Sequence, residues 1–581
     1  MWFTGESSLQ KPLPDTLSRP SARGWAWLPL AAALMLGVVW LILAFSEPFG
    51  VQDDARQHAV WFEAARDPEL FADDFIAAFF VGNNTPVFKA LYALPASLGI
   101  SPLLLTKLYP VPLTLLTAWL AFRFLLGTGI RPVAAALGAV LFVQGIWVSD
   151  DIASATARAF SWPMLMAVLV CWRENRAVLG AALGVVLSLT YPSAAVFAGG
   201  MIGLVCLAKL LDGKKTLADL RALWTRPAIV VAGLFLGALA ALATGTGGDV
   251  VSAAEARRMA EFDEGGRTAF FLENPITYWL LAKRSGALPE PVLRHVLLLA
   301  AVALAALRWQ RLPLAARRLS LAAIIAGLIL WAAAHATLFT LYLPGRYSLI
   351  GERVAFCVLA GAGLAAWLPS QPSRLWKGLA AALVALPLLA LLVPPRTLTL
   401  ISVPEAPRLM AALGETPKNS LVAGFSRDLD DIPASSLRRV LTAREYHLPY
   451  DMAYALAMRD RLADTAAAVF ASGPEGVETL VQRYGVTHLL IERGQVTPQG
   501  ARQSWWWPIL AQDGRQPDCS AEACRVWVLE QPRCVVAEQA GHVLLSAACL
   551  LAPAPAPAML PSAGNAGAPR PDGAEPRPAA G

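Results

Sequence analysis

Residues 25–62 read WAWLPLAAALMLGVVWLILAFSEPFGVQDDARQHAVWF, and this stretch holds the two features that decide the fold. Residues 25–44 contain no charged side chain. An α-helix needs about 20 such residues to cross the hydrocarbon core of a bilayer, which is ~30 Å thick. Two aspartates, an arginine and a histidine follow within a few residues. The stretch therefore predicts a membrane-spanning helix that ends in a charged segment at one face of the membrane.

The rest of the chain has the composition of a membrane protein. Of its 581 residues, 56% are hydrophobic and 15% are charged, whereas about 25% of residues are charged in an average soluble domain. The mean hydropathy is +0.51. We therefore expect an all-α polytopic membrane bundle of about 11 transmembrane helices. The predicted spans are residues 25–46, 102–126, 132–149, 156–172, 177–190, 192–210, 227–245, 291–308, 319–341, 353–369 and 375–393.

The basic residues predict the orientation of this bundle. The isoelectric point is near 9.0, but the basic residues lie in short loops between spans, which argues against a nucleic-acid partner. Placing the N-terminus inside puts most of these loops in the cytoplasm, as the positive-inside rule requires. We expect a multi-pass protein of the bacterial inner membrane, with residues 1–24 as a cytoplasmic tail and residues 25–393 as the transmembrane domain.

Residues 394–551 have the composition of a soluble domain. The segments RLMAALGETPKNSLVAGF and VETLVQRYGVTHLLIERG each predict an amphipathic helix, a turn and a short buried strand. This alternation favours a small α/β domain, which an odd number of spans places in the periplasm. Residues 552–581 are rich in Pro, Ala and Gly and are predicted to be disordered. Disulfides form in oxidising compartments, and three pairings are open to four cysteines in the domain: Cys519, Cys524, Cys534 and Cys549.

Charged residues gather in three loops that this topology places at the outer face. If the first loop is helical, Asp54 and His58 share a face because they are four residues apart. Arg158 falls inside the start of a span, where an ionisable side chain is costly and is functional by default. The alternative is that these groups are ordinary solvated helix ends and interfacial anchors. The residues concerned are Asp53, Asp54, His58, Asp73 and Asp74 in the first loop, Asp150, Asp151 and Arg158 in WVSDDIASATARAFSWP, and Arg346, Tyr347, Glu352 and Arg353 in LYLPGRYSLIGERV.

Carboxylates and arginines at one membrane face suit the transfer of a sugar from a lipid phosphate. Guanidinium groups bind phosphate bidentately, and a carboxylate can accept the proton of an acceptor hydroxyl. Paired carboxylates can instead hold a divalent cation, here Mg²⁺ or Mn²⁺ on Asp54 and Asp151. The predicted catalytic residues are Asp53, Asp54, Asp150 and Asp151, and the predicted substrate-binding residues are His58, Arg158, Arg346, Tyr347 and Arg353.

The order of these motifs resembles the GT-C superfamily of polyprenyl-phosphate-dependent glycosyltransferases. That superfamily includes protein O-mannosyltransferases, aminoarabinose transferases and oligosaccharyltransferases. The strings DDARQH, RAF and PGRY look most like its bacterial members. The resemblance implies that Asp53 or Asp54 is the acidic residue of the first loop, that Asp150 and Asp151 form the second acidic motif, and that Arg346 binds phosphate.

The resemblance also implies the partners, namely membrane lipids, a polyprenyl-phosphate-linked sugar and a glycan, lipid or protein acceptor. The SWWWPI segment at 504–509 is not followed by Asp-Tyr-Gly, so the oligosaccharyltransferase signature is absent and the acceptor stays unassigned.

Two other classes of function are compatible with the sequence. A transporter or flippase for lipid-linked sugars would carry polar residues along a path through the membrane, whereas the charged residues here gather at one face. A non-catalytic assembly protein would leave the acidic pairs dispersed. We therefore predict a hexosyl or pentosyl transferase, with both acidic pairs beside Arg346 around one outer cavity.

Overall fold

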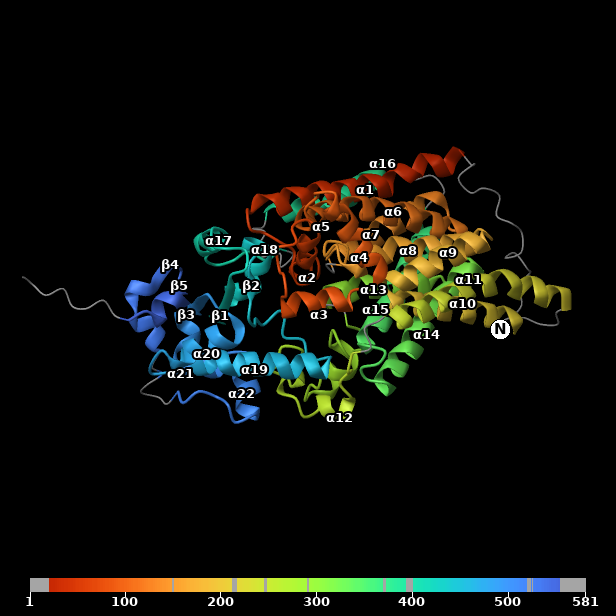
Figure 1. The fold of residues 1–581 in the computed structure, drawn as a ribbon. Helices are drawn as coiled ribbons and strands as arrows, with labels where there is room; N and C mark the ends of the chain where they lie inside the picture. The colour runs from red at the N-terminus through yellow and green to blue at the C-terminus, as the bar shows by residue number, and fades with distance from the viewer. Residues whose placement is uncertain are drawn as a thin grey trace, which may run out of the picture.

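The structure is a computed structural model that describes residues 20–148, 151–211, 217–244, 248–289, 292–368, 373–392, 401–519, 524 and 526–553. A helical bundle occupies one end of the molecule and a C-terminal α/β domain the other (Figure 1). This architecture confirms the predicted fold class. The predicted domain limits stay a prediction, because most of the N-terminal tail and nearly all of the C-terminal tail lie outside the described residues.

A helix lies at each of the eleven predicted spans. Among the described residues, six helical segments are long and apolar enough to cross a membrane: Arg23–Ser46, Pro102–Gly127, Pro192–Leu210, Leu314–Ala336, Pro344–Trp367 and Arg374–Leu392. These segments indicate a multi-pass membrane protein, while the count of eleven crossings stays a prediction. The helices are α1 (Pro20–Ser46), α5 (Pro102–Leu108), α6 (Pro110–Gly127), α7 (Pro132–Val148), α8 (Ala157–Arg173), α9 (Ala177–Thr190), α10 (Pro192–Leu210), α11 (Leu217–Thr244), α13 (Val292–Leu307), α14 (Leu314–Ala336), α15 (Pro344–Trp367) and α16 (Arg374–Ala385).

The expectation of a loop at LYLPGRYSLIGERV is wrong for most of that segment. Helix α14 ends at Ala336, and α15 begins at Pro344, so that Arg346 and Arg353 are helical. Proline is favoured in the first turn of a helix because its missing N–H needs no partner there. The 24 residues of α15 span about 36 Å at 1.5 Å per residue.

The segment after α1 is packed between the bundle and the C-terminal domain rather than exposed to solvent. It contains α2 (Asp53–His58), a 3-10 helix (Val60–Ala65), α3 (Phe75–Asn83) and α4 (Pro86–Ser97). The Gln52 side chain caps α2 by accepting a hydrogen bond from the Ala55 N–H at 2.8 Å. In Figure 1, α2 and α3 lie at the junction of the two parts.

The C-terminal domain is built on a five-stranded mixed sheet. Strand β1 (Leu421–Phe425) is parallel to β2 (Arg439–Val440) and to β3 (His488–Glu492), whereas β5 (His542–Ser546) is antiparallel to β3 and to β4 (Val535–Gln539). The strand order is β2-β1-β3-β5-β4. The helices are α17 (Pro407–Gly414), α18 (Ile432–Ser436), α19 (Met452–Val469), α20 (Glu475–Tyr484), α21 (Pro498–Gln503), α22 (Trp507–Gln512) and α23 (Ala547–Leu551).

The two predicted helix–strand units are confirmed. Helix α17 leads to β1, all of whose residues are buried. Helix α20 leads to β3 and ends at Gly485, whose φ of 73° is the left-handed conformation that favours glycine. The structure also selects one of the three possible disulfide pairings, joining Cys519 to Cys524 and Cys534 to Cys549.

A second segment, residues 248–289 between α11 and α13, packs against the C-terminal domain. It contains α12 (Ala253–Ala256) and a π-helical turn (Thr277–Leu281). Its Glu261 is fully buried and pairs with Arg459 of α19 at 2.5 Å. This contact ties the segment that enters α13 to the sheet domain.

Candidate active site at the start of α8 and α15

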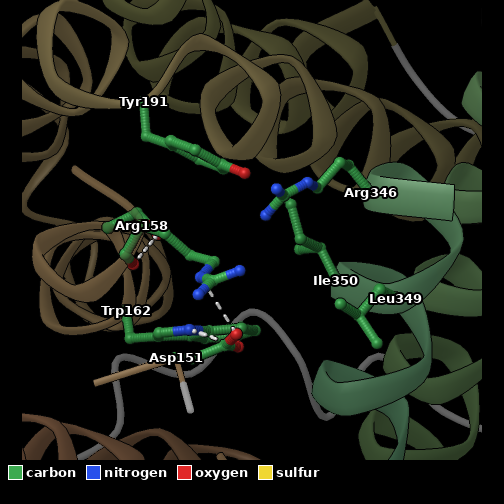
Figure 2. Close-up of a pocket in the computed structure, with 8 residues that line it drawn as sticks. Asp151, Arg158, Trp162, Tyr191, Arg346, Leu349 and Ile350 are labelled. Atoms are coloured by element: carbon green, nitrogen blue, oxygen red, sulfur yellow. Dashed lines mark hydrogen bonds and ion pairs between the residues drawn. The ribbon is translucent and has the colours of Figure 1, made fainter. Parts of the chain in front are cut away.

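Helices α8 and α15, together with the residue that precedes α10, border a small cavity lined by charged, aromatic and aliphatic side chains. It measures about 220 Å³, which includes space open to solvent. Figure 2 shows Arg158, Tyr191 and Arg346 extending toward its centre. The cavity is lined by Asp151, Arg158, Ser161, Trp162, Tyr191, Arg346, Leu349 and Ile350.

Asp151 forms the buried floor of this cavity. Its side chain is 2% exposed, and its Oδ1 lies 3.2 Å from Nε of Arg158. Its Oδ2 accepts a hydrogen bond from Nε1 of Trp162 at 3.0 Å and forms an ion pair with Arg353. Because a buried charge must be paired, both carboxylate oxygens are committed to the protein. Asp151 therefore fixes the direction in which Arg158 projects.

Asp54 reaches the same guanidinium from α2. Its Oδ2 lies 2.5 Å from Nη2 of Arg158, and its side chain is 33% exposed. Burial would raise the pKa of this carboxyl, but the attraction of Arg158, reinforced by Lys283 and Arg346, lowers it to about 2. Asp54 is therefore ionised at physiological pH and retains access to solvent.

Arg346 stands across the cavity in the first turn of α15. Among the described residues, no carboxylate forms an ion pair with its guanidinium, although Asp54 is close enough to feel its charge. His58, at the end of α2, also senses the charges of Asp54 and Arg346, and burial lowers the pKa of its imidazole. Two guanidinium groups, those of Arg158 and Arg346, thus line the cavity, and the partly exposed carboxylate of Asp54 pairs with Arg158 without itself lining the cavity.

The other predicted site residues lie elsewhere. Asp53 is 48% exposed and pairs with Arg56, away from the cavity. Tyr347 is 3% exposed, and neither it nor Arg353 lines the cavity. Asp150 lies outside the described residues. The structure therefore brings together Asp54, Asp151, Arg158 and Arg346, but not Asp53.

Sequence reasoning missed the polar lining residues Ser161, Trp162 and Tyr191, and also Lys283 near Asp54. Trp162 stands one helical turn after Arg158, a spacing that places both on one face of α8. Tyr191 directly precedes Pro192 at the start of α10, where Tyr would serve equally well as an interfacial anchor. Lys283 carried no signal in the sequence, because it lies far from both acidic motifs and is brought near Asp54 by the fold.

The predicted divalent-cation site on Asp54 and Asp151 does not fit the residues present. Both oxygens of Asp151 are engaged by Arg158, Arg353 and Trp162, and Asp54 is engaged by Arg158. A divalent cation here would face two guanidinium groups at close range. Elsewhere in the described residues, no group of three or more His, Cys, Asp or Glu is arranged to hold a metal ion.

Comparisons with known proteins found similarity only among solved structures. No protein-family model and no curated protein sequence matches this chain. An oligosaccharyltransferase from Archaeoglobus fulgidus, solved with zinc and sulfate, aligns over 82% of this chain and 70% of its own, with 13% identity and a TM-score of 0.40. The same archaeal enzyme with an inhibitory peptide and a dolichol-phosphate aligns over 84% and 72%, with 12% identity and a TM-score of 0.44.

The arabinofuranosyltransferase AftD from Mycobacteria aligns over 80% of this chain, with 15% identity and a TM-score of 0.47. This chain spans only 36% of that enzyme's length. By their names, these similar structures are an oligosaccharyltransferase and an arabinofuranosyltransferase. Because all of these identities are 15% or less and all of these TM-scores are below 0.5, the alignments assign no activity, substrate or residue role to this chain.

Proposed function

We propose that this protein is an integral membrane glycosyltransferase that moves a sugar from a polyprenyl-phosphate donor to an extracytoplasmic acceptor. The observation that carries the proposal is the cavity lined by Arg158 and Arg346, beside which an ionised, partly exposed Asp54 pairs with Arg158. Guanidinium groups match the geometry and charge of a phosphate leaving group. The carboxylate is placed to receive the proton of an acceptor hydroxyl.

The ion pair between Arg158 and Asp54 implies that the donor binds before Asp54 acts as a base. While Arg158 holds Asp54, the low pKa of about 2 makes that carboxylate a weak base. A donor phosphate bound to Arg158 and Arg346 neutralises part of the positive charge that lowers this pKa. The basicity of Asp54 then rises only once the donor is in place, which suits a transferase that must avoid acting on an empty site. Asp151 and Arg353 keep Arg158 oriented throughout.

The topology follows from this role. We place the cavity at the outer membrane face of a bacterial inner membrane, the N-terminus in the cytoplasm and residues 394–551 in the periplasm. A lipid-linked donor then reaches the cavity from the outer leaflet, and the acceptor reaches it from the periplasmic side. The sugar, hexose or pentose, is open.

The test is sugar transfer from radiolabelled polyprenyl-phosphate sugars in membranes containing the wild type or Asp54→Asn. We expect Asp54→Asn to abolish transfer at unchanged expression. Asp73→Asn is the matched control, because Asp73 is an exposed carboxylate of the same loop whose φ of 54° asparagine also tolerates. Transfer that survives Asp54→Asn would refute the proposed role, and movement of intact donor across the membrane without transfer would favour a flippase.

A further inference from the structure

Helix α2 carries two sets of side chains that point to different partners. Asp54 pairs with Arg158 of the cavity, whereas Arg56 and Gln57 are buried against the C-terminal domain. Nη1 of Arg56 lies 2.6 Å from Oδ1 of Asp431 and its Nη2 lies 3.8 Å from Oε2 of Glu445. Nε2 of Gln57 donates a hydrogen bond to the Glu445 carbonyl at 2.6 Å. The helix that holds Asp54 is therefore gripped from its other side by residues 430–447.

An apolar contact reinforces this grip. Trp61, which is 1% exposed, packs its ring 5.2 Å from the ring of Tyr446. Ala55 and Trp61 belong to the same buried cluster as Tyr446, Met410 and Tyr454. The backbones of Val51 and Ser402 exchange two hydrogen bonds, of 3.1 and 2.7 Å, directly before α2. The contact is thus continuous along the loop rather than limited to one ion pair.

The Glu445 carboxylate also binds residues 248–289, the segment between α11 and α13. Oε1 of Glu445 lies 2.7 Å from Nη2 of Arg267, whose Nε donates to the Arg444 carbonyl at 2.9 Å. Arg267 belongs to residues 248–289, the segment that brings Lys283 near Asp54. Glu445 therefore contacts both α2, which carries Asp54, and residues 248–289, which carry Lys283.

Helix α2 cannot hold this position by itself. It is six residues long, and an isolated helix of fewer than about 12 residues is unstable in water because its first turn is costly to form. Its position must come from its contacts, and Arg56 supplies the buried ones that carry charge. Asp54 and Arg56 are rigidly linked because only one residue separates them on that short helix.

We propose that residues 430–447 of the C-terminal domain position the Asp54 carboxylate, with Arg56 as the positioning residue. The C-terminal domain is then part of the catalytic unit. An acceptor that displaces residues 430–447 moves Asp54 relative to Arg158. The consequence for sugar transfer rests on the proposed function, whereas the dependence of α2 on this contact does not.

The first experiment needs no substrate. Hydrogen–deuterium exchange of the full-length protein in nanodiscs is compared for the wild type, Arg56→Gln and the control Arg493→Gln, whose ion pair with Glu538 is exposed. We expect exchange in residues 50–62 to rise about tenfold or more in Arg56→Gln, with β3 unchanged, because one partner of a buried ion-pair network is removed. Unchanged exchange in residues 50–62 overturns the proposal. If Arg56→Gln does not fold, Glu445→Gln is measured by the same criterion.

The second experiment asks whether the contact positions the carboxylate for transfer. Arg56→Gln should lower kcat for sugar transfer about tenfold or more while KM for the donor stays near the wild-type value, because Arg158 and Arg346 are untouched. Arg56→Lys, which keeps the charge, should restore part of kcat. A loosened α2 with an unchanged kcat overturns the positioning role. Absence of transfer in the wild type counts against the proposed function alone. The hydrogen–deuterium exchange result then decides whether α2 depends on its contact with residues 430–447.

Discussion

Two carboxylates share Arg158, and replacing each with asparagine should separate a structural role from a functional one. The side chain of Asp151 is 2% exposed and that of Asp54 is 33% exposed. Asp151→Asn removes the counter-charge that Asp151 provides to the buried side chains of Arg353 and Arg158. Removing one partner of a buried ion pair costs about 3–5 kcal/mol. Asp54→Asn removes a partly exposed pair, which is worth about 0–1 kcal/mol, and Arg158 keeps Asp151.

Denaturant unfolding in detergent micelles, followed by tryptophan fluorescence, measures this difference. We expect the free energy of unfolding to fall by about 3–5 kcal/mol in Asp151→Asn and by less than about 1 kcal/mol in Asp54→Asn. A double-mutant cycle with Arg353→Gln provides the control. The loss in Asp151→Asn/Arg353→Gln should be smaller than the sum of the single losses by about 0.5–3 kcal/mol, because the two side chains are in contact.

The result that would refute this reasoning is equal destabilisation by the two single substitutions. A loss of about 3 kcal/mol or more in Asp54→Asn would make Asp54 a structural partner of Arg158. Any loss of sugar transfer in that variant would then follow from unfolding, and the cavity would lack its candidate base. Additive losses in the double-mutant cycle would separately refute the direct pairing of Asp151 with Arg353.

Three further predictions concern the outer part of the molecule. Burial opposes ionisation of Glu261, but hydrogen bonds from His447 and Arg459 lower its pKa to about 2. The ionised Glu261 therefore stabilises the fold above pH 4.5, the pKa of the unfolded state, and this stabilisation is lost as the pH falls toward 2. Between these pH values the free energy of unfolding should drop by about 3 kcal/mol in the wild type and by far less in Glu261→Gln. Burial raises the pKa of Asp431 to about 6 despite its ion pair with Arg56. The folded state then retains a proton that the unfolded state loses, so Tm should fall between pH 4.5 and pH 6.5 and Asp431→Asn should flatten that slope; an equal slope in both proteins contradicts the assignment. The bond between Cys534 and Cys549, 15 residues apart, should contribute about 3 kcal/mol, and equal unfolding free energies for the wild type and Cys534→Ser/Cys549→Ser would contradict this.

The sequence was informative wherever one local rule decided the structure. Apolar runs of about 20 residues located every predicted helix of the bundle, and Gly485 marked the end of α20. The failure at residues 344–352 has a physical cause. The charged residues Arg346 and Glu352 lower the hydropathy of this stretch, so the predicted span begins only at Arg353, whose charge is neutralised in the fold by Asp151, remote in sequence. Local composition cannot report a partner brought there by the fold.

The split of the first acidic pair has a similar cause. Neighbouring residues on a helix point in different directions, so Asp53 and Asp54 could not both face one cavity once the segment was helical. The sequence does not say which of the two faces inward. In the fold, Arg56 pairs with both Asp431 and Asp53, which places the Asp53 side chain on the face of α2 that contacts the C-terminal domain. Arg346 and Tyr347 divide in the same way, the first lining the cavity and the second buried.

The charges around the cavity favour a particular kind of donor. Asp54 and Asp151 carry two negative charges, and Arg158, Arg346 and Arg353 carry three positive charges. Among the described residues, Arg346 is the cavity-lining guanidinium with which no carboxylate forms an ion pair. A phosphodiester carries one negative charge, so a sugar joined to its lipid through a single phosphate matches the charge of Arg346. A diphosphate would bring a surplus of negative charge beside Asp54, which is why we expect monophosphate-linked donors to bind better.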